Sequence, residues 1–178
     1  MKTPAAVLRE MGRPAPYAAS KPLAVEEVSL EGPGPGEVLV EIAGAGLCHS
    51  DLSVISGDRP RMMPIVLGHE ASGTVREVGP GVTDLRPGDP VVFSFVTASG
   101  RCVPCASGGP AICERGSAAN AAGTLLGGAR RFSDSKGDPL HHHQGVSAFS
   151  RFTVAARESV VAIDPDVPLE KAAIFGCG

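Results

Sequence analysis

Glycine and proline restrict the fold of this chain more than any other feature of its sequence. There are 23 glycines and 16 prolines among 178 residues, about 22% of the chain against roughly 12% in an average protein. They are spread along the chain without a collagen or linker period. This spread favours many short strands joined by turns, and the length suits one domain with its own core.

Six segments are predicted to be strands because they are short, apolar or β-branched, and mostly bounded by Gly or Pro. They cover residues 5–9, 25–30, 38–43, 73–78, 91–95 and 149–155. Residues 50–55 are predicted to form a short helix, with Ser50 or Asp51 near its start and Gly57 just after its end. Residues 108–145 are rich in Gly, Ala and Ser without a period, and are predicted to be irregular. We therefore expect a mainly β domain, a closed or nearly closed barrel with long loops and few helices.

The composition excludes several classes of function. The net charge is −3 and no basic stripe is present that could neutralise a phosphate backbone, so we expect no nucleic-acid partner. No apolar stretch approaches the roughly 18 residues of a membrane span, and the N-terminal segment does not resemble a signal peptide. We therefore expect a cytoplasmic protein without a membrane partner. In such a reducing compartment, the five cysteines are better explained as metal ligands or reactive thiols than as disulfides.

Three separated segments carry candidate zinc ligands. Cys48 lies in Gly-Leu-Cys-His-Ser-Asp, His69 follows 21 residues later in Gly-His-Glu, and Cys177 lies in Gly-Cys-Gly near the end of the chain. Two thiolates and one imidazole are an established ligand set for a catalytic zinc that keeps one position open. Taken singly, each residue also has an ordinary structural explanation, because a buried cysteine packs as a small hydrophobic residue.

Taken together, these segments resemble the zinc alcohol dehydrogenases of the medium-chain dehydrogenase/reductase family, over essentially the whole chain. The resemblance implies a chaperonin-10-like barrel that is the catalytic domain of an oxidoreductase. Such an enzyme transfers a hydride between an alcohol or aldehyde and NAD or NADP, with zinc as a Lewis acid. By this resemblance Cys48, His69 and Cys177 match the catalytic zinc ligands, and Glu70 matches the acidic neighbour that can approach the metal.

The neighbours of Cys48 match further roles in the family. Ser50 matches the hydroxyl that passes on the proton of the alcohol, and Asp51 matches a partner of the free imidazole nitrogen of His69. Both residues could instead be helix caps. His49 matches the position of a cation that binds the cofactor pyrophosphate. Ser53 departs from the family, because many members carry a proton-relaying histidine there.

A second cysteine group lies in residues 99–113. By the resemblance, Cys102, Cys105 and Cys113 match three of the four ligands of a structural zinc, and Ser99 stands at the fourth. Structural zinc sites are almost always closed by four ligands, and a serine hydroxyl is a poor one. The sequence therefore leaves three alternatives open: a zinc site, a loop with free thiols, or a redox pair of Cys102 and Cys105.

Three consecutive histidines, His141 to His143, suggest a metal site at first sight. Neighbouring side chains of an extended segment point to opposite faces, however, so we expect these three not to converge. The resemblance places four residues along the substrate pocket, and this polar set suggests a polar or charged alcohol: Arg59, Phe95, His143 and Gln144.

The family continues after Gly-Cys-Gly into a doubly wound nucleotide-binding domain that carries Gly-x-Gly-x-x-Gly. That fingerprint does not occur here, and Gly44-Ala45-Gly46 lacks its third glycine. We therefore expect residues 1–178 to be a truncated catalytic domain, inactive by itself, whose full-length relatives are homo-oligomers. Two other classes of function are kept as alternatives: a non-enzymatic barrel that serves as a binding module, and a thiol redox protein.

Overall fold

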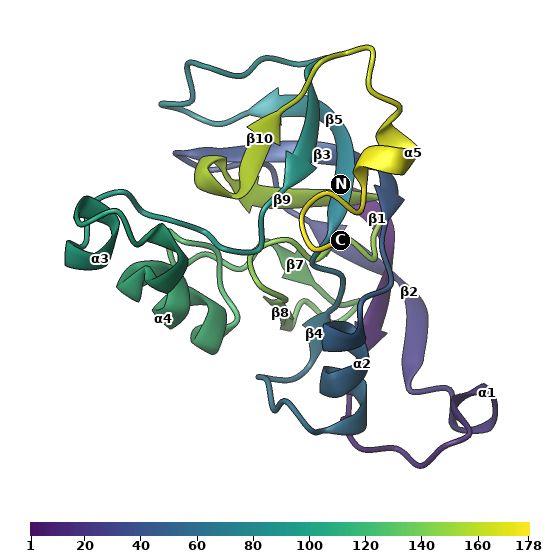
Figure 1. The fold of residues 1–178 in the computed structure, drawn as a ribbon. Helices are drawn as coiled ribbons and strands as arrows, with labels where there is room; N and C mark the ends of the chain where they lie inside the picture. Colours follow the sequence, from purple (N-terminus) through teal and green to yellow (C-terminus); the bar gives the residue numbers. More distant parts are fainter.

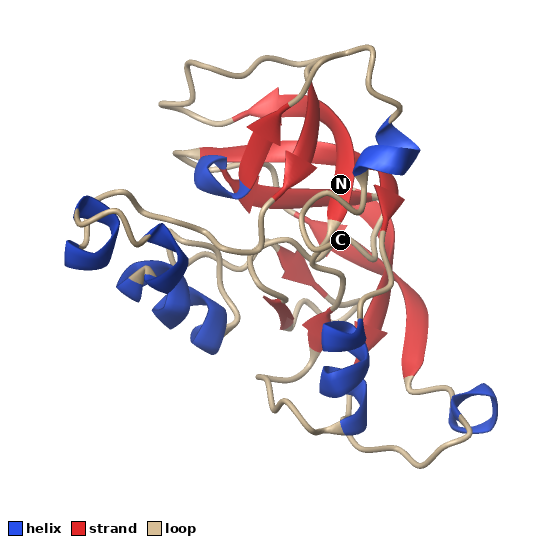
Figure 2. Cartoon of the chain, viewed as in Figure 1, coloured by secondary structure: helices blue, strands red, loops and turns tan.

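Two sheets organise the fold, which is described by a computed structural model of residues 1–178 (Figures 1 and 2). The strands are β1 (Lys2–Leu8), β2 (Leu23–Leu30), β3 (Glu37–Ala45), β4 (Ile65–Val66), β5 (Ala71–Val78), β6 (Pro90–Phe93), β7 (Phe132–Ser133), β8 (Pro139–His142), β9 (Phe152–Ala156) and β10 (Val160–Ala162). A closed barrel has the order β1-β2-β7-β8-β4, and a five-stranded sheet has the order β10-β6-β5-β3-β9. The predicted mainly β barrel is confirmed.

The helices are short and lie outside the two sheets (Figure 2). They are α1 (Tyr17–Ser20), α2 (His49–Ser56), α3 (Val103–Ala106), α4 (Glu114–Ala122) and α5 (Leu169–Ala172), with single 3-10 turns η1 (Pro110–Ile112) and η2 (Arg157–Ser159). None of these helices is long and apolar enough to cross a membrane.

The pairing of β4 with β8 decides where the functional residues meet. The two strands run parallel, with Ile65 opposite His141 and Val66 opposite His142. Because parallel strands end at the same edge, the residues that follow them, His69 and His143, come to one end of the barrel. The ring centroids of these two histidines are 5.5 Å apart.

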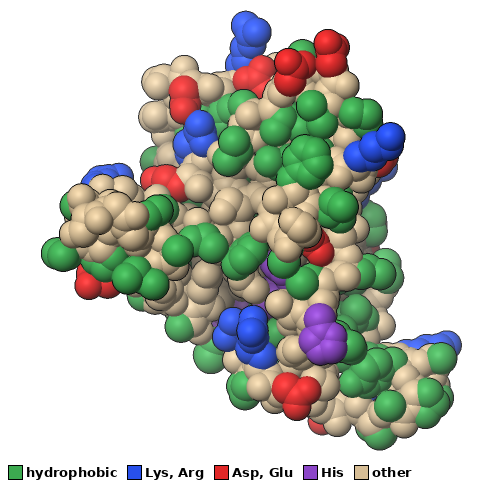
Figure 3. Space-filling view, in the orientation of Figure 1, with side chains coloured by type: hydrophobic (Ala, Val, Ile, Leu, Met, Phe, Trp, Pro, Cys, Tyr) green, Lys and Arg blue, Asp and Glu red, His purple; other side chains and the backbone are tan.

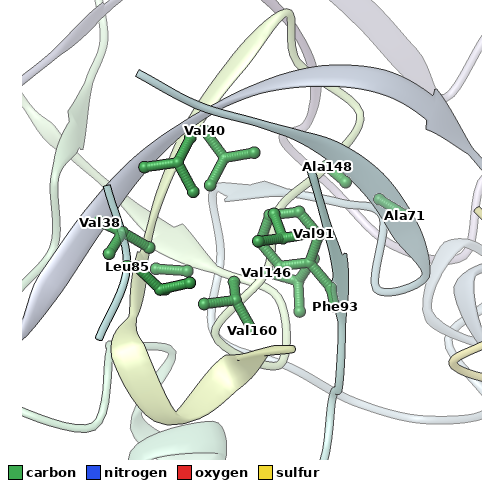
Figure 4. Packing of buried hydrophobic residues seen from close by; sticks show 11 residues of the cluster. Val38, Val40, Ala71, Leu85, Val91, Phe93, Val146, Ala148 and Val160 are labelled. Carbon is green, nitrogen blue, oxygen red and sulfur yellow. The ribbon is translucent and has the colours of Figure 1, made fainter. Parts of the chain in front are cut away.

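The five-stranded sheet encloses a core of 11 buried apolar residues (Figure 4). Val38 and Val40 of β3 alternate into this core and are fully buried, as expected for a strand with one face on a core. Val91 and Phe93 of β6 pack against them from across the sheet. A second cluster of 10 buried residues fills the closed barrel. Each fully buried Val or Phe side chain contributes about 1.5–3 kcal/mol by leaving water.

The helix predicted over residues 50–55 is confirmed as α2, at His49–Ser56. It begins after Cys48 and ends at Gly57, whose φ of 88° lies in the left-handed region that favours glycine. Asp51 is buried on this helix and makes no capping hydrogen bond, so its side chain is free for another partner.

The prediction that residues 108–145 are irregular is wrong, because this segment contains α4, β7 and β8. Helix α4 has the sequence ERGSAANAA, which carries no apolar stripe, and Gly116 is its one buried residue. Its helical character was therefore invisible to a search for periodic apolar residues. The strands β7 and β8 contain only two and four residues.

Candidate metal centre and cysteine lobe

Three donor atoms from distant parts of the chain converge at one end of the barrel. Cys48 precedes α2, His69 follows β4, and Cys177 follows α5. The two Sγ atoms are 3.5 Å apart, and Sγ of Cys177 lies 3.8 Å from Nε2 of His69. Two thiolates bound tetrahedrally at 2.3 Å from zinc would be about 3.8 Å apart, so this set fits a zinc ion. His69 is buried whereas Cys177 is exposed, which leaves one side of the set accessible.

The pKa values of the two thiols of this set are shifted in opposite directions. The backbone and side chain of Ser50 lower the pKa of Cys48. The adjacent Cys48 sulfur, followed by burial, raises the pKa of Cys177 to about 11. Two thiolates in contact repel each other, so both ionise only when a cation lies between them. The donor set is therefore suited to a divalent cation and poorly suited to remaining empty.

Asp51 contacts the imidazole of the donor set. Its Oδ2 lies 2.9 Å from Nδ1 of His69, and its Oδ1 accepts a hydrogen bond of 3.0 Å from the backbone N–H of Gly68. Burial acts to lower the pKa of His69, but the contacts with Asp51 and Cys48 outweigh it and the pKa is raised. A proton on Nδ1 leaves Nε2 free to bind a metal, which is the usual arrangement around zinc.

Glu70 lies beside the same donor set. It is buried, and its charge contributes to the raised pKa of Cys177. The side chain passes over Gly46, where a Cβ atom would come within 2.5 Å of the Glu70 carboxyl carbon. Glycine at position 46 therefore makes room for this carboxylate.

Three further polar residues lie at the start of α2: His49, Ser50 and Ser53. His49 is exposed at the first position of the helix, and Ser50 is half-buried next to Cys48. The hydroxyl of Ser53 donates a hydrogen bond of 3.0 Å to the carbonyl of His49. Ser53 is thus engaged within the helix.

The predicted substrate residues are divided between different environments. Phe95 and Gln144 line a cavity of about 170 Å³ together with residues of α4. His143 is fully buried behind Asp51, and Arg59 is exposed on the segment after α2. The structure therefore brings Phe95 and Gln144 together but places neither Arg59 nor His143 in this cavity.

The three consecutive histidines do not converge, as expected from their alternation. Nδ1 of His141 lies 3.2 Å from the carbonyl of Ala122, and Nε2 of His142 accepts a hydrogen bond of 3.2 Å from the backbone N–H of Arg131. Only His143 faces the metal centre.

Residues 99–122, here called the cysteine lobe, project to one side of the barrel (Figure 1). Sγ of Cys102 lies 3.3 Å from Sγ of Cys105 and 3.7 Å from Sγ of Cys113. Sγ of Cys113 lies 3.4 Å from Oγ of Ser99, so the serine hydroxyl adjoins the group at Cys113. The three Sγ atoms lie within 4.8 Å of one another, close enough to bind one metal ion.

The surroundings of Cys113 favour its thiolate form. The hydroxyl and the backbone N–H of Ser99 and the N–H of Gly116 lower its pKa to about 6. The two N–H groups each lie 3.3 Å from Sγ. The sequence analysis did not identify Gly116 as part of this group. Its position was a signal, because the side chain of an N-cap residue accepts a hydrogen bond from the N–H three residues later.

Arg61 is a second residue that the sequence analysis missed. Its Nε is buried without a hydrogen-bond partner, and burial followed by the charge of Arg59 lowers its pKa. No local sequence signal distinguishes it from a surface arginine. Figure 3 shows Lys and Arg side chains beside a hollow between α2 and the cysteine lobe, in which a histidine is visible.

Comparison with known proteins gives one consistent result. Residues 34–164 match the alcohol dehydrogenase GroES-like domain. The chain is 41% identical to S-(hydroxymethyl)glutathione dehydrogenase of Saccharomyces cerevisiae over 163 residues, 91% of this chain and 42% of that protein. It is 44% identical to putative alcohol dehydrogenase D of Mycobacterium tuberculosis over 178 residues, 100% of this chain and 46% of that protein.

Solved structures with a similar fold come from the same group of proteins. The crystal structure of an alcohol dehydrogenase zinc-binding domain protein from Burkholderia ambifaria matches with a TM-score of 0.89 and 35% identity, over 100% of this chain and 46% of that one. The chain thus spans a little under half the length of the proteins that it matches. Through its GroES-like domain, the chain belongs to the zinc-dependent alcohol dehydrogenases of the medium-chain dehydrogenase/reductase family.

Proposed function

We propose that the chain is the catalytic domain of a zinc- and NAD(P)-dependent oxidoreductase that acts on an alcohol or aldehyde. The convergence of Cys48 Sγ, His69 Nε2 and Cys177 Sγ within 4.8 Å of one another carries this proposal. Zinc in such a set supplies a Lewis acid that lowers the pKa of an alcohol oxygen. The accessible side of the set is where the substrate oxygen would enter.

The residues around the set have separate tasks in this proposal. Asp51 fixes the tautomer of His69 through its contact at Nδ1. Ser50, half-buried one residue beyond the first position of α2, receives the hydroxyl proton of the alcohol. The hydroxyl of Ser53 already donates to the carbonyl of His49, so we propose that the proton leaves Ser50 through water.

The cysteine lobe is proposed to hold a second, structural zinc through Cys102, Cys105 and Cys113, with the Ser99 hydroxyl at the fourth corner. From residue 101 to residue 122 only Cys113 and Gly116 are buried, so the lobe has no hydrophobic core of its own. Small units without a core are generally stabilised by a metal or by disulfides. The third thiol, 3.7 Å from Cys102, supports a metal set over a two-cysteine redox pair.

The substrate is proposed to be polar or negatively charged. Arg59 and Arg61 have no ion-pair partner, and Nε of Arg61 is desolvated. Burial lowers the pKa of His143 to about 4, and the positive charges of His69, Arg61 and Arg59 also act to lower it. A desolvated guanidinium gains most from an anionic partner.

The test is NAD(P)-linked alcohol oxidation by residues 1–178 alone and after fusion to the remaining part of putative alcohol dehydrogenase D. We expect no turnover by residues 1–178, because they contain no Gly-x-Gly-x-x-Gly. Positioning the hydride acceptor against the substrate can lower the activation free energy by about 7–11 kcal/mol. We expect turnover by the fusion, abolished by Cys48→Ala. Turnover by the isolated chain, or by a fusion that carries Cys48→Ala, would contradict the proposal.

A further inference from the structure

His143 is a buried polar side chain that packing alone does not explain. It is fully buried, and neither Nδ1 nor Nε2 has a hydrogen-bond partner. A buried polar atom without a partner costs about 1–3 kcal/mol, so an apolar side chain of similar size would be more stable here. Such groups in a folded protein call for a specific explanation.

The imidazole of His143 faces the carboxylate that holds the metal ligand. Its Nε2 lies 3.4 Å from Oδ1 of Asp51, while Oδ2 of the same carboxylate lies 2.9 Å from Nδ1 of His69. The rings of His69 and His143 meet edge to face, at an angle of 85° between their planes. Asp51 therefore lies between two imidazoles, and the three side chains are buried together.

The backbone around His143 is held in an unusual conformation. Gln144 and Ser147 have φ values of 51° and 53°, in the left-handed region that non-glycine residues rarely adopt. The N–H of His143 donates a hydrogen bond of 2.8 Å to Oγ of Ser147, and Oγ1 of Thr153 donates one of 2.6 Å to the carbonyl of Val146. Residues held in this way persist only where the surroundings enforce them, and they accumulate at functional sites.

We propose that His143 is a positioning residue of the metal centre, which restrains the Asp51 carboxylate in the orientation that fixes His69. This inference rests on the proposed function, and it moves His143 from the substrate pocket to the support of a zinc ligand. The contact lacks hydrogen-bond geometry, so the neutral ring acts through its dipole and its shape, in a buried site where polar contacts are strong.

A second metal ion held by Asp51, His69 and His143 is the competing explanation. A second ion would require Nδ1 of His69 to bind it while Nε2 binds the first. A neutral imidazole has only one ring nitrogen without a proton, so the ring would have to lose its remaining proton. The distance of 2.9 Å from Asp51 Oδ2 to His69 Nδ1 is instead that of a direct contact between the two side chains.

The test is the binding of Co²⁺ to the chain, followed by visible absorption and by competition with a chelator. Each variant is compared with its own Cys48→Ala counterpart, so that cobalt in the cysteine lobe is subtracted. We compare His143→Leu, which removes both ring nitrogens, with His143→Gln, which returns a nitrogen near the position of Nε2. The matched control is His142→Leu, which removes an equally buried imidazole that faces away from the metal centre.

We expect His143→Leu to weaken Co²⁺ binding about tenfold and to shift the visible bands, and His143→Gln to restore affinity to within about threefold of the wild type. His142→Leu is expected to leave the affinity and the bands unchanged. Wild-type affinity and bands in His143→Leu would overturn the inference, as would equal losses in all three variants or two cobalt ions that depend on Asp51. A wild-type chain without Cys48-dependent cobalt would instead overturn the proposed function itself.

Discussion

Oδ2 of Asp51 lies 2.9 Å from Nδ1 of His69, which links helix α2 to the segment that follows β4. One segment thus carries Cys48, a proposed metal ligand just before α2, and Asp51, which contacts a second proposed ligand. Cys48, at the N-cap of the helix, makes no side-chain capping bond, and Asp51 in the first turn is directed to His69.

The first prediction concerns this support. Asp51→Asn keeps the size of the side chain but removes its charge, so His69 is less firmly held with Nε2 toward the metal. We expect zinc affinity to fall about 10–100-fold, measured by competition with a chromophoric chelator. Asp58→Asn, on the exposed segment after α2, is the control and should bind as the wild type does. Unchanged affinity in Asp51→Asn would show that the contact does not serve the metal.

The second prediction concerns the fourth corner of the cysteine lobe. Ser99→Cys supplies a thiolate 3.4 Å from Cys113 in place of a weak ligand, so zinc should be held more tightly there. We expect more zinc per chain after dialysis and a higher melting temperature, because structural zinc contributes directly to the free energy of folding. Ser107→Cys adds an exposed thiol to the same lobe and should change neither quantity. A rise with Ser107→Cys, or none with Ser99→Cys, would contradict the assignment.

The third prediction concerns Gly116, which lies within α4. Alanine is favoured over glycine by about 1 kcal/mol in a helix interior. Here, however, a Cβ atom would come within 2.0 Å of the carbonyl oxygen of Thr97, which is backbone and cannot move aside freely. We expect Gly116→Ala to destabilise the protein by about 1–3 kcal/mol in urea unfolding. Ala118→Gly, at an exposed position of the same helix, should lower the free energy of unfolding only by the difference in helix propensity between the two residues. A stabilised Gly116→Ala variant would show that the lobe is not packed as described.

The fourth prediction concerns stability against pH. Burial, followed by the charges of Arg131 and His141, lowers the pKa of His142 to about 3. An unfolded histidine has a pKa of about 6.5, so between these values the unfolded chain binds a proton that the folded chain does not. The free energy of unfolding is therefore unaffected by His142 above pH 6.5, and it decreases as the pH falls from 6.5 toward 3.

We expect the urea midpoint of the metal-free chain to decrease as the pH falls through this window, and His142→Leu to decrease less steeply. The slope is the relevant quantity, because the substitution also removes the acceptor for the N–H of Arg131 and lowers stability at every pH. Equal slopes for the two chains would show that His142 does not titrate with unfolding.

Local patterns in the sequence were sufficient to predict the helices and strands that bury one side against a core. The alternation of Val38 and Val40 predicted β3, and Gly57 predicted the end of α2. Helix α4 escaped prediction because it buries one glycine and no apolar side chain. The short strands β7 and β8 escaped because two or four residues carry no measurable period.

The proposed metal ligands and the supporting role of Asp51 could be predicted from motifs, whereas the contact of His143 with Asp51 could not. Cys48, His69 and Cys177 each lie in a short recognisable segment, and Asp51 is three residues from one of them. The approach of His143 to Asp51 depends on the parallel pairing of β4 with β8, which joins segments more than 70 residues apart. No local pattern encodes such a contact.

The most direct measurement is the zinc content of the purified chain, determined by elemental analysis for the wild type, Cys48→Ala and Cys105→Ser. If Cys48, His69 and Cys177 hold a catalytic zinc, Cys48→Ala removes about one equivalent, because a set reduced to two protein ligands no longer holds the ion. Cys105→Ser should lower only the zinc of the cysteine lobe, so the two losses should add in the double variant. Zinc content that Cys48→Ala leaves unchanged would contradict the central claim.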